Sequence, residues 1–543
     1  MNGEKKHRKS SKKKWIVTAG IIAIMSGIWL ALRSGLKPSR ITYPCQRAAL
    51  SNIDVFKMMV VSLFPGIANT IVSKKSKTLL VMGGLLVTSM FVSTNMVQND
   101  YFYPSQIDYS TLPIQLDEHI ATLENPSNLY YVRNASGQNG SMDLAVTTLF
   151  SMLESNGESF YNSSESSGLI SATDVIVFKV NAQWDRRGGT NNDLLRSLIQ
   201  AILNHPDGFT GEIVICDNGQ GYGHFDYGRS NAYNDSNNVL RVVESFHPAK
   251  VSAYLWDDLR TEEVAEFSTG DTDDGYVVSD SFDTETQLYV SYPKFTTVFG
   301  TNVSFKKGTY NGTHYDSDKL KVINTNVLKS HRRYGVTACV KNYMGLPMGM
   351  IVNPISSIIP HEHFSIALGG MGALMAEVRA PILNILDMIW ICPHPLEESS
   401  RCGPDVMYTS AKFADIIAAS TDPVALDYWS AKNVLCQAAE YLEYEKYSSM
   451  DPDYEPISPS YPGNHPMDES FHNYLNRSNE VLIEHGYSFT MDPDRMNVFI
   501  TNLENSTTPI PTEHPTDFSM ILVGSSIIGG LLVIAVLVYL RKK

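Results

Sequence analysis

Short apolar runs alternate with amphipathic segments along the middle of the chain. Residues 175–180 and residues 212–216 are apolar runs enriched in β-branched side chains, and residues 192–203 between them place Leu194 and Leu198 at helical spacing. A β-branched run bounded by polar residues predicts a buried strand, and apolar residues three to four positions apart predict an amphipathic helix. This strand–helix–strand order predicts an α/β fold with a doubly wound, mainly parallel sheet.

The same patterns extend the predicted α/β domain over residues 143–445. The additional predicted strands are residues 251–255, 320–327 and 385–391, and the additional predicted helices are residues 143–153, 411–419 and 423–439. Residues 261–318 are rich in Asp, Thr, Ser, Tyr and Gly, which is typical of a β-rich insertion or of surface loops. Residues 99–142 are polar and turn-rich, and we expect a lead-in or stalk there. Residues 446–517 hold many prolines and predict an irregular coat followed by a spacer.

Long apolar segments near both ends of the chain predict membrane helices. Residues 15–32, 79–97 and 520–540 are each long enough to cross a bilayer. Residues 55–72 are a weaker candidate because they carry a lysine, a proline and a glycine. We therefore predict an N-terminal membrane region over residues 1–98 with about three helices. A C-terminal transmembrane helix with a basic end is predicted over residues 518–543.

Basic clusters beside these segments predict their orientation. With three N-terminal crossings, the basic N-terminus, residues 74–77 and the basic C-terminal end all face the cytoplasm, as the positive-inside rule expects. This predicts an integral protein of the cell membrane whose large domain is extracytoplasmic. The alternative, in which residues 55–72 do not span, stays open. The predicted outer region holds eight glycosylation sequons, at Asn134, Asn139, Asn162, Asn234, Asn302, Asn311, Asn476 and Asn505.

Charge and cysteine usage exclude some classes of function. The net charge is −14 and the basic residues are concentrated at the N-terminus, which argues against nucleic-acid binding through a broad basic surface. The chain has six cysteines, and none has the spacing of a zinc finger. Cys392 and Cys402 flank a Pro-rich loop. The sequence leaves open whether they form a disulfide or remain reduced thiols.

The segment from Lys329 to Gly345 concentrates cationic and amide donors next to glycines. It contains His331, Lys341 and Asn342, and it has no acidic residue. An anion-binding loop needs such donors together with glycines, which let the backbone approach the ligand closely. The alternative interpretation is a basic patch beside a turn.

Polar residues also follow other predicted strands. Lys179 and Asn181 come at the end of one strand, Thr190 follows before the next helix, and Asp217 ends the next strand. Because ligands of open α/β sheets gather beyond the carboxyl ends of the strands, we expect these side chains and Lys329 to meet in one cleft. For each residue a structural role is the alternative, such as capping a turn or binding its own loop.

The order of these short motifs resembles the DUF362 family, which lacks a settled general activity. The resemblance runs over roughly residues 170–435. It implies site roles for two further positions, Asp387 and the Asp422 of a Ser-Thr-Asp-Pro-Val-Ala-Leu-Asp segment. Asp422 also precedes a proline in the manner of a helix N-cap, which is its structural alternative. Many relatives carry ferredoxin-like cysteine clusters. This chain has no Cys-x-x-Cys, so an intrinsic iron–sulfur cluster is not expected.

We infer a membrane-anchored, outward-facing protein that acts on or binds an anionic small molecule, with a divalent metal as a candidate cofactor. The alternatives are a non-catalytic envelope protein that only captures the ligand, and a redox-associated protein that works with a partner. The sequence does not identify a protein partner. The candidate catalytic residues are Asp217, Lys341 and His331; the candidate ligand-binding residues are Lys179, Asn181, Thr190, Lys329, Asn342 and Asp422; and the candidate metal ligands are Asp217 and Asp387.

Overall fold

The computed structural model describes residues 110–135, 139–331, 334–348, 362–395, 411–445, 447–455 and 470–504. All of them belong to one compact unit, residues 107–543. Among these residues, no helix has both the length and the apolar character needed to cross a bilayer. The four segments predicted to span the membrane lie outside the described residues.

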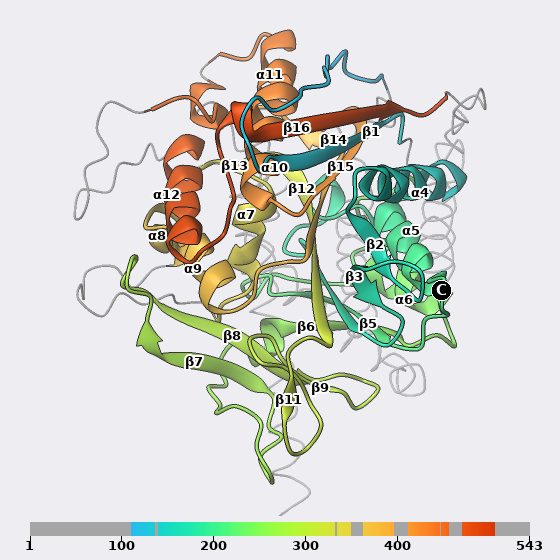
Figure 1. Ribbon diagram of the computed structural model, residues 1–543, viewed down its shortest axis with the longest axis vertical. Helices are drawn as coiled ribbons and strands as arrows, with labels where there is room; N and C mark the ends of the chain where they lie inside the picture. The colour runs from blue at the N-terminus through green and yellow to red at the C-terminus, as the bar shows by residue number, and fades with distance from the viewer. Residues whose placement is uncertain are drawn as a thin grey trace, which may run out of the picture. The chain divides into compact units, whose positions relative to one another are not determined.

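A nine-stranded sheet organises this unit (Figure 1). Eight strands follow one another in the order β16-β1-β15-β14-β12-β4-β5-β6, and the short β13 pairs with β12. Their bounds are β16 Met496–Asn502, β1 Ser127–Arg133, β15 Lys412–Ser420, β14 Leu383–Cys392, β12 Leu320–His331, β4 Val175–Lys179, β5 Glu212–Asp217, β6 Val251–Leu255 and β13 Gly335–Thr337.

The sheet is parallel over one half and mixed over the other. Strands β6, β5, β4, β12 and β14 are mutually parallel. Strand β15 runs antiparallel to both β14 and β1, and β1 is parallel to β16. The structure is therefore mixed α/β with a large sheet, as predicted.

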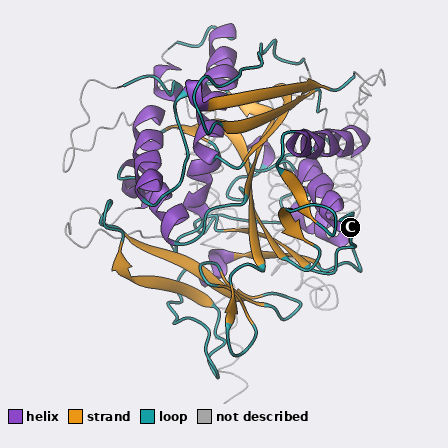
Figure 2. Cartoon of the chain, viewed as in Figure 1, coloured by secondary structure: helices purple, strands orange, loops and turns teal. Residues whose placement is uncertain are grey.

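Helices cover both faces of the sheet (Figure 2). Alternate side chains of β4 enter different cores, because Val175 and Val177 pack on one face while Ile176 and Phe178 pack on the other. The second face is covered by α4 Asn139–Ser155, α5 Asn192–Leu203 and α6 Val239–Ser245. The remaining helices are α7 Cys339–Asn342, α8 Glu362–Ala367, α9 Gly370–Glu377, α10 Pro423–Ser430, a π-helical turn Ala431–Cys436, α11 Gln437–Tyr441 and α12 Phe471–Glu484.

The segment interpreted as an insertion holds a second, antiparallel sheet in the order β11-β10-β9-β8-β7. Its strands are β7 Gly275–Phe282, β8 Tyr289–Thr296, β9 Asn302–Ser304, β10 Gly308–Tyr310 and β11 Tyr315–Asp316. Another small sheet is the parallel pair of β2 Ser159–Asn162 and β3 Gly168–Ser171.

Three segments differ from the sequence predictions. Residues 411–419, predicted as a helix, form β15, because the run is buried on both faces between β14 and β1. Residues 99–142, predicted as a lead-in, contain β1, which lies inside the sheet. Residues 446–517, predicted as irregular, contain α12 and β16. Local patterns miss β1 and β16 because the two strands pair with each other across most of the chain.

The cysteines that the structure describes divide into two states. Cys216, Cys339 and Cys436 are buried free thiols. Cys392 is disulfide-bonded, and Cys402 lies outside the described residues.

Candidate functional site

Two of the predicted site residues form a buried ion pair where β4 and β5 end. Lys179 Nζ lies 2.6 Å from Asp217 Oδ1, and neither side chain is more than 3% exposed. The other Asp217 oxygen accepts a hydrogen bond from the Ala182 N–H at 2.6 Å. Burial lowers the pKa of Lys179 and raises the pKa of Asp217, and the ion pair opposes both shifts. The pair therefore joins the carboxyl ends of β4 and β5 and holds the start of the loop that follows β4.

Gly345 covers this ion pair closely. A Cβ atom added at Gly345 would lie 2.7 Å from Lys179 Nζ and would overlap Asp217 Oδ1. Any larger residue at this position would force the Lys179 or Asp217 side chain to shift. The glycine of the 329–345 segment thus approaches protein groups of the site.

A row of amide side chains crosses the sheet beside Lys179. In the strand register, Asn324 of β12 lies next to Lys179, and Asn384 of β14 lies next to Asn324. Asn324 donates to the Asn384 side chain at 2.9 Å and accepts from Asn342 Nδ2 at 2.8 Å. Asn342 also donates to the Lys179 carbonyl at 3.2 Å. Sequence analysis missed Asn324 and Asn384, although an asparagine inside an otherwise apolar strand is a visible signal.

The loop between β4 and α5 is closed by Asn181 and Thr190. The Asn181 N–H donates to Thr190 Oγ1 at 2.9 Å, and the Thr190 N–H donates back to the Asn181 carbonyl at 3.0 Å. Thr190 Oγ1 also donates to the Thr325 carbonyl at 2.8 Å. These bonds hold the loop against β12 and place both predicted residues side by side.

Asp387 and Lys329 lie under the same loop. Asp387 accepts hydrogen bonds from the Asn191 and Ile389 N–H groups at 2.9 and 3.0 Å. It also accepts from Asn231 Nδ2 at 3.1 Å. Burial raises the pKa of Asp387 to about 7. The buried ammonium of Lys329 donates to the Gly188 carbonyl.

The buried Arg187 was missed by sequence analysis. Its guanidinium donates to the Asn231 side chain at 3.0 Å and lies 4.2 Å from the ring centre of Trp390. A single arginine in a polar loop gives no signal in the sequence.

The remaining predicted residues lie on other elements. Lys341 is buried in α7, next to Asn342. Asp427, from α10, caps α7 by accepting from its first N–H groups at 2.7 and 2.8 Å. His331 ends β12, roughly 20 Å along the strand from Asn324. Its ring contacts the Tyr334 N–H at 3.3 Å.

Asp422 is the N-cap of α10. One of its carboxylate oxygens accepts from the Val424 and Ala425 N–H groups at 2.8 and 3.0 Å. The other accepts from Ser127 Oγ at 2.6 Å and from the Thr490 N–H at 3.0 Å. Burial raises the pKa of Asp422 to about 6. The structural alternative stated for Asp422 is therefore present, and its ligand role stays a prediction.

A small pocket opens where the β4–α5 loop meets residues 224–239. Asn181, Thr190 and Asn192 line one side, and Asn231 and Tyr227 lie among the residues of the other. The cavity volume is about 20 Å³, so it admits roughly one small polar group. The side-chain oxygens of Asn181 and Asn192 are buried and accept no hydrogen bond from the residues that the structure describes. Lys179 and Asp217 are not part of this lining.

The glycine-rich loop after β5 holds an anion that belongs to the protein itself. The N–H groups of Gly219 and Gly221 donate to the carboxylate of Asp257, the first at 2.6 Å. The Gly223 N–H adds a longer contact of 3.4 Å. Successive N–H groups that converge on one carboxylate form an anion nest. The Asp257 carboxylate therefore occupies this anion nest.

Neither predicted metal ligand has the companions that a metal site needs. Asp217 and Asp387 belong to no group of three close His, Cys, Asp or Glu side chains among the residues that the structure describes. Their role as metal ligands stays a prediction.

Comparison with known proteins gives one match. Residues 280–432 match the family model for DUF362, described as a domain of unknown function. No curated protein and no solved structure matches the chain. The matched stretch contains Lys329, Lys341, Asp387 and Asp422, and it is shorter than the resemblance seen in the sequence. Over residues 280–432, the chain is therefore similar to the DUF362 family.

Proposed function

We propose that the protein binds a small molecule carrying both an anionic group and hydroxyl groups, such as a sugar or polyol phosphate. One polar group of the ligand enters the pocket between the β4–α5 loop and residues 224–239, and the rest of the ligand lies at the mouth of this pocket. The observation that carries this proposal is the position of the pocket at the carboxyl edge of the parallel strands, the usual ligand site of open α/β sheets. Asn181 and Thr190, two residues selected from the sequence, line it.

Two buried cationic side chains favour an anionic group on the ligand. Lys329 contacts Gly188, the neighbour of the pocket residue Gly189, and Arg187 contacts the pocket residue Asn231. The positive end of the α5 dipole also points at the pocket, because Asn192 is the first residue of that helix. Asp387 opposes this potential only in part, because its pKa of about 7 leaves it partly protonated at neutral pH.

The side-chain oxygens of Asn181 and Asn192, which accept no hydrogen bond from the described residues, favour hydroxyl groups on the ligand. Buried acceptors without a donor are costly, and a ligand hydroxyl that donates to Asn181 or Asn192 removes that cost. Trp184 and Tyr227 are partly exposed among the lining residues. An aromatic ring beside amide groups is a favourable surface for the C–H face of a polyol.

The ion pair and the amide row hold the geometry in this proposal. Lys179 and Asp217 fix the start of the loop at Ala182, and Asn342 ties α7 to β4 and β12. Lys341 is carried by α7 beside Asn342. The catalytic roles of Asp217, Lys341 and His331 stay predictions.

We also propose that this domain is anchored to the membrane and faces outward. A disulfide at Cys392 is favoured in an oxidising compartment. The sequon asparagines whose side chains the structure describes are all exposed or partly exposed, which glycosylation requires. These are Asn134, Asn162, Asn234, Asn302, Asn311 and Asn476.

Thermal unfolding of the full chain in detergent tests the ligand class, with glycerol 3-phosphate, inorganic phosphate and glycerol as probes. Wild type is expected to be stabilised most by glycerol 3-phosphate, less by phosphate and least by glycerol. Asn192→Leu should lose the advantage of glycerol 3-phosphate over phosphate, because it removes the amide that recognises a hydroxyl. Lys329→Met should lose most of the response to both anions.

Lys294→Met is the matched control. Lys294 is equally buried but lies in β8 of the insertion sheet, where it contacts Asp271. It should lower basal stability without changing the response to either anion. A wild type that responds to no anion, or a Lys329→Met variant that responds as Lys294→Met does, contradicts the proposal.

A further inference from the structure

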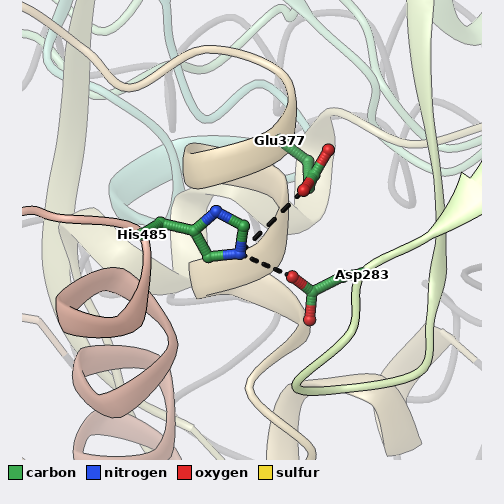
Figure 3. Close-up of side chains that lie close together, drawn as sticks. All are labelled: Asp283, Glu377 and His485. Atoms are coloured by element: carbon green, nitrogen blue, oxygen red, sulfur yellow. Dashed lines mark hydrogen bonds and ion pairs between the residues drawn. The ribbon is translucent and has the colours of Figure 1, made fainter.

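Asp283, Glu377 and His485, which are far apart in the sequence, direct their side chains at one point (Figure 3). His485 Nε2 lies 2.7 Å from Asp283 Oδ2 and 3.9 Å from Glu377 Oε1. One ligand atom from each residue lies within 4.8 Å of the others. We propose that Asp283, Glu377 and His485 bind a divalent transition-metal ion, with Zn²⁺ as the best fit. This site is independent of the ligand pocket.

The turn between β7 and β8 presents one oxygen of Asp283. Its Oδ1 atom accepts from the Thr286 N–H at 2.6 Å and from the Thr286 hydroxyl at 2.7 Å. Oδ2 is left facing His485. Burial raises the pKa of Asp283, but the hydrogen bonds from Thr286 and His485 outweigh it, so the pKa falls below its usual value. The two hydrogen bonds from Thr286 therefore hold the carboxylate in place, as a metal ligand requires.

Close packing of two helices places the other two ligands. Glu377 ends α9, and His485 caps the C-terminus of α12. At Gly372, α9 approaches so near that an added Cβ atom would overlap the Ser478 carbonyl of α12. A contact this tight keeps the ends of both helices at a fixed spacing. Figure 3 shows both side chains directed at the same point as Asp283.

The ligand set and spacing suit Zn²⁺. Tetrahedral zinc with bonds of about 2.0–2.1 Å separates its ligand atoms by about 3.3 Å. The two observed separations, 2.7 and 3.9 Å, bracket this value. His485 and Glu377 side chains are 26% and 30% exposed, so small rotations reach it. An imidazole nitrogen with two carboxylate oxygens favours zinc over calcium or magnesium, which prefer oxygen ligands only.

A metal here would join three separate elements. It would link the β7–β8 turn of the insertion sheet to the ends of α9 and α12. The protein ligands number three, which leaves a coordination position for water. We therefore expect the ion to stabilise the attachment of the insertion sheet.

Isothermal titration of the EDTA-treated full chain with Zn²⁺ tests the site. Wild type is expected to bind one Zn²⁺ at this site and to unfold at a higher temperature with the metal. Glu377→Gln is the critical variant, because it keeps the side-chain shape and leaves the His485–Asp283 contact intact. It should bind Zn²⁺ at least roughly tenfold more weakly, and His485→Ala should do the same.

His472→Ala is the matched control on the same helix. His472 Nε2 lies 3.8 Å from Glu455 Oε1, so it is a histidine beside one carboxylate. Its substitution should leave Zn²⁺ affinity unchanged. Unfolding curves without metal verify that each variant is folded. If wild type binds no Zn²⁺, or if Glu377→Gln binds it as tightly as wild type, the three residues are only a histidine–carboxylate ion pair and the inference is overturned.

Discussion

Lys179→Met tests whether the Lys179–Asp217 pair is a structural element of the site. The substitution keeps the apolar part of the side chain and leaves Asp217 buried without its counter-charge. Removing one partner of a buried ion pair costs about 3–5 kcal/mol. A domain of roughly 400 residues has an unfolding entropy of about 0.8 kcal/mol/K, so a loss of about 4 kcal/mol lowers the unfolding midpoint by about 5 °C.

The double variant Lys179→Met/Asp217→Asn should cost about 2 kcal/mol less than the sum of the single variants, because it removes both charges. The direction in which the stability of Lys179→Met changes with pH can also be predicted. Burial raises the pKa of Asp217, so without Lys179 the ionisation of this carboxyl group opposes folding. The loss of unfolding free energy in Lys179→Met relative to wild type should therefore be larger at about pH 8 than at about pH 5.

Thermal unfolding of the full chain, followed by circular dichroism, measures these differences. Lys432→Met is the control, because Lys432 pairs with Asp451 at 2.8 Å but is 36% exposed. Its loss should shift the midpoint by less than about 1 °C. If Lys179→Met shifts the midpoint no more than Lys432→Met does, the buried pair does not hold the loop, and its assignment as a positioning element is wrong.

Three further predictions concern the site and the topology. Sulfate keeps its charge between about pH 6 and pH 8, whereas Asp387 ionises near pH 7, so sulfate binding measured by titration should weaken several-fold with rising pH in wild type but not in Asp387→Asn. Asp427→Ala leaves two N–H groups of α7 without an acceptor and should cost about 2 kcal/mol in urea unfolding, whereas no change would show that the cap is dispensable. Labelling of intact cells with an impermeant thiol reagent should mark Ser141→Cys but not Ser11→Cys, and the opposite result would reverse the proposed topology.

The parallel half of the sheet could be predicted because its signals are local. The apolar run of β4, the amphipathic α5 and the run of β5 each show their own periodicity, and the polar residues at their ends follow from the direction of the strands. The antiparallel half could not be predicted in this way. Strand β15 is rich in alanine and becomes a strand only because β14 and β1 pair with both of its edges.

The candidate site shows the same limit. Asn181 and Thr190 lie side by side because one short loop carries both. The Asn324–Asn384 contact depends on strand register, which local patterns do not define. The cluster of Asp283, Glu377 and His485 depends on the packing of three elements spread over two hundred residues. Convergence of that kind appears only once the tertiary fold is known.

Anomalous diffraction from crystals of the protein soaked in selenate is the most direct test of the proposed anion site. Selenate has the shape and charge of sulfate, and selenium reports its own position. The proposal predicts a selenium peak in the pocket, within hydrogen-bonding distance of Asn181, Thr190 or Asn192. The peak should be absent from Lys329→Met crystals and retained in Lys294→Met crystals. Selenate bound only at other surfaces, or a pocket that stays free of selenium at every concentration, would contradict the proposal.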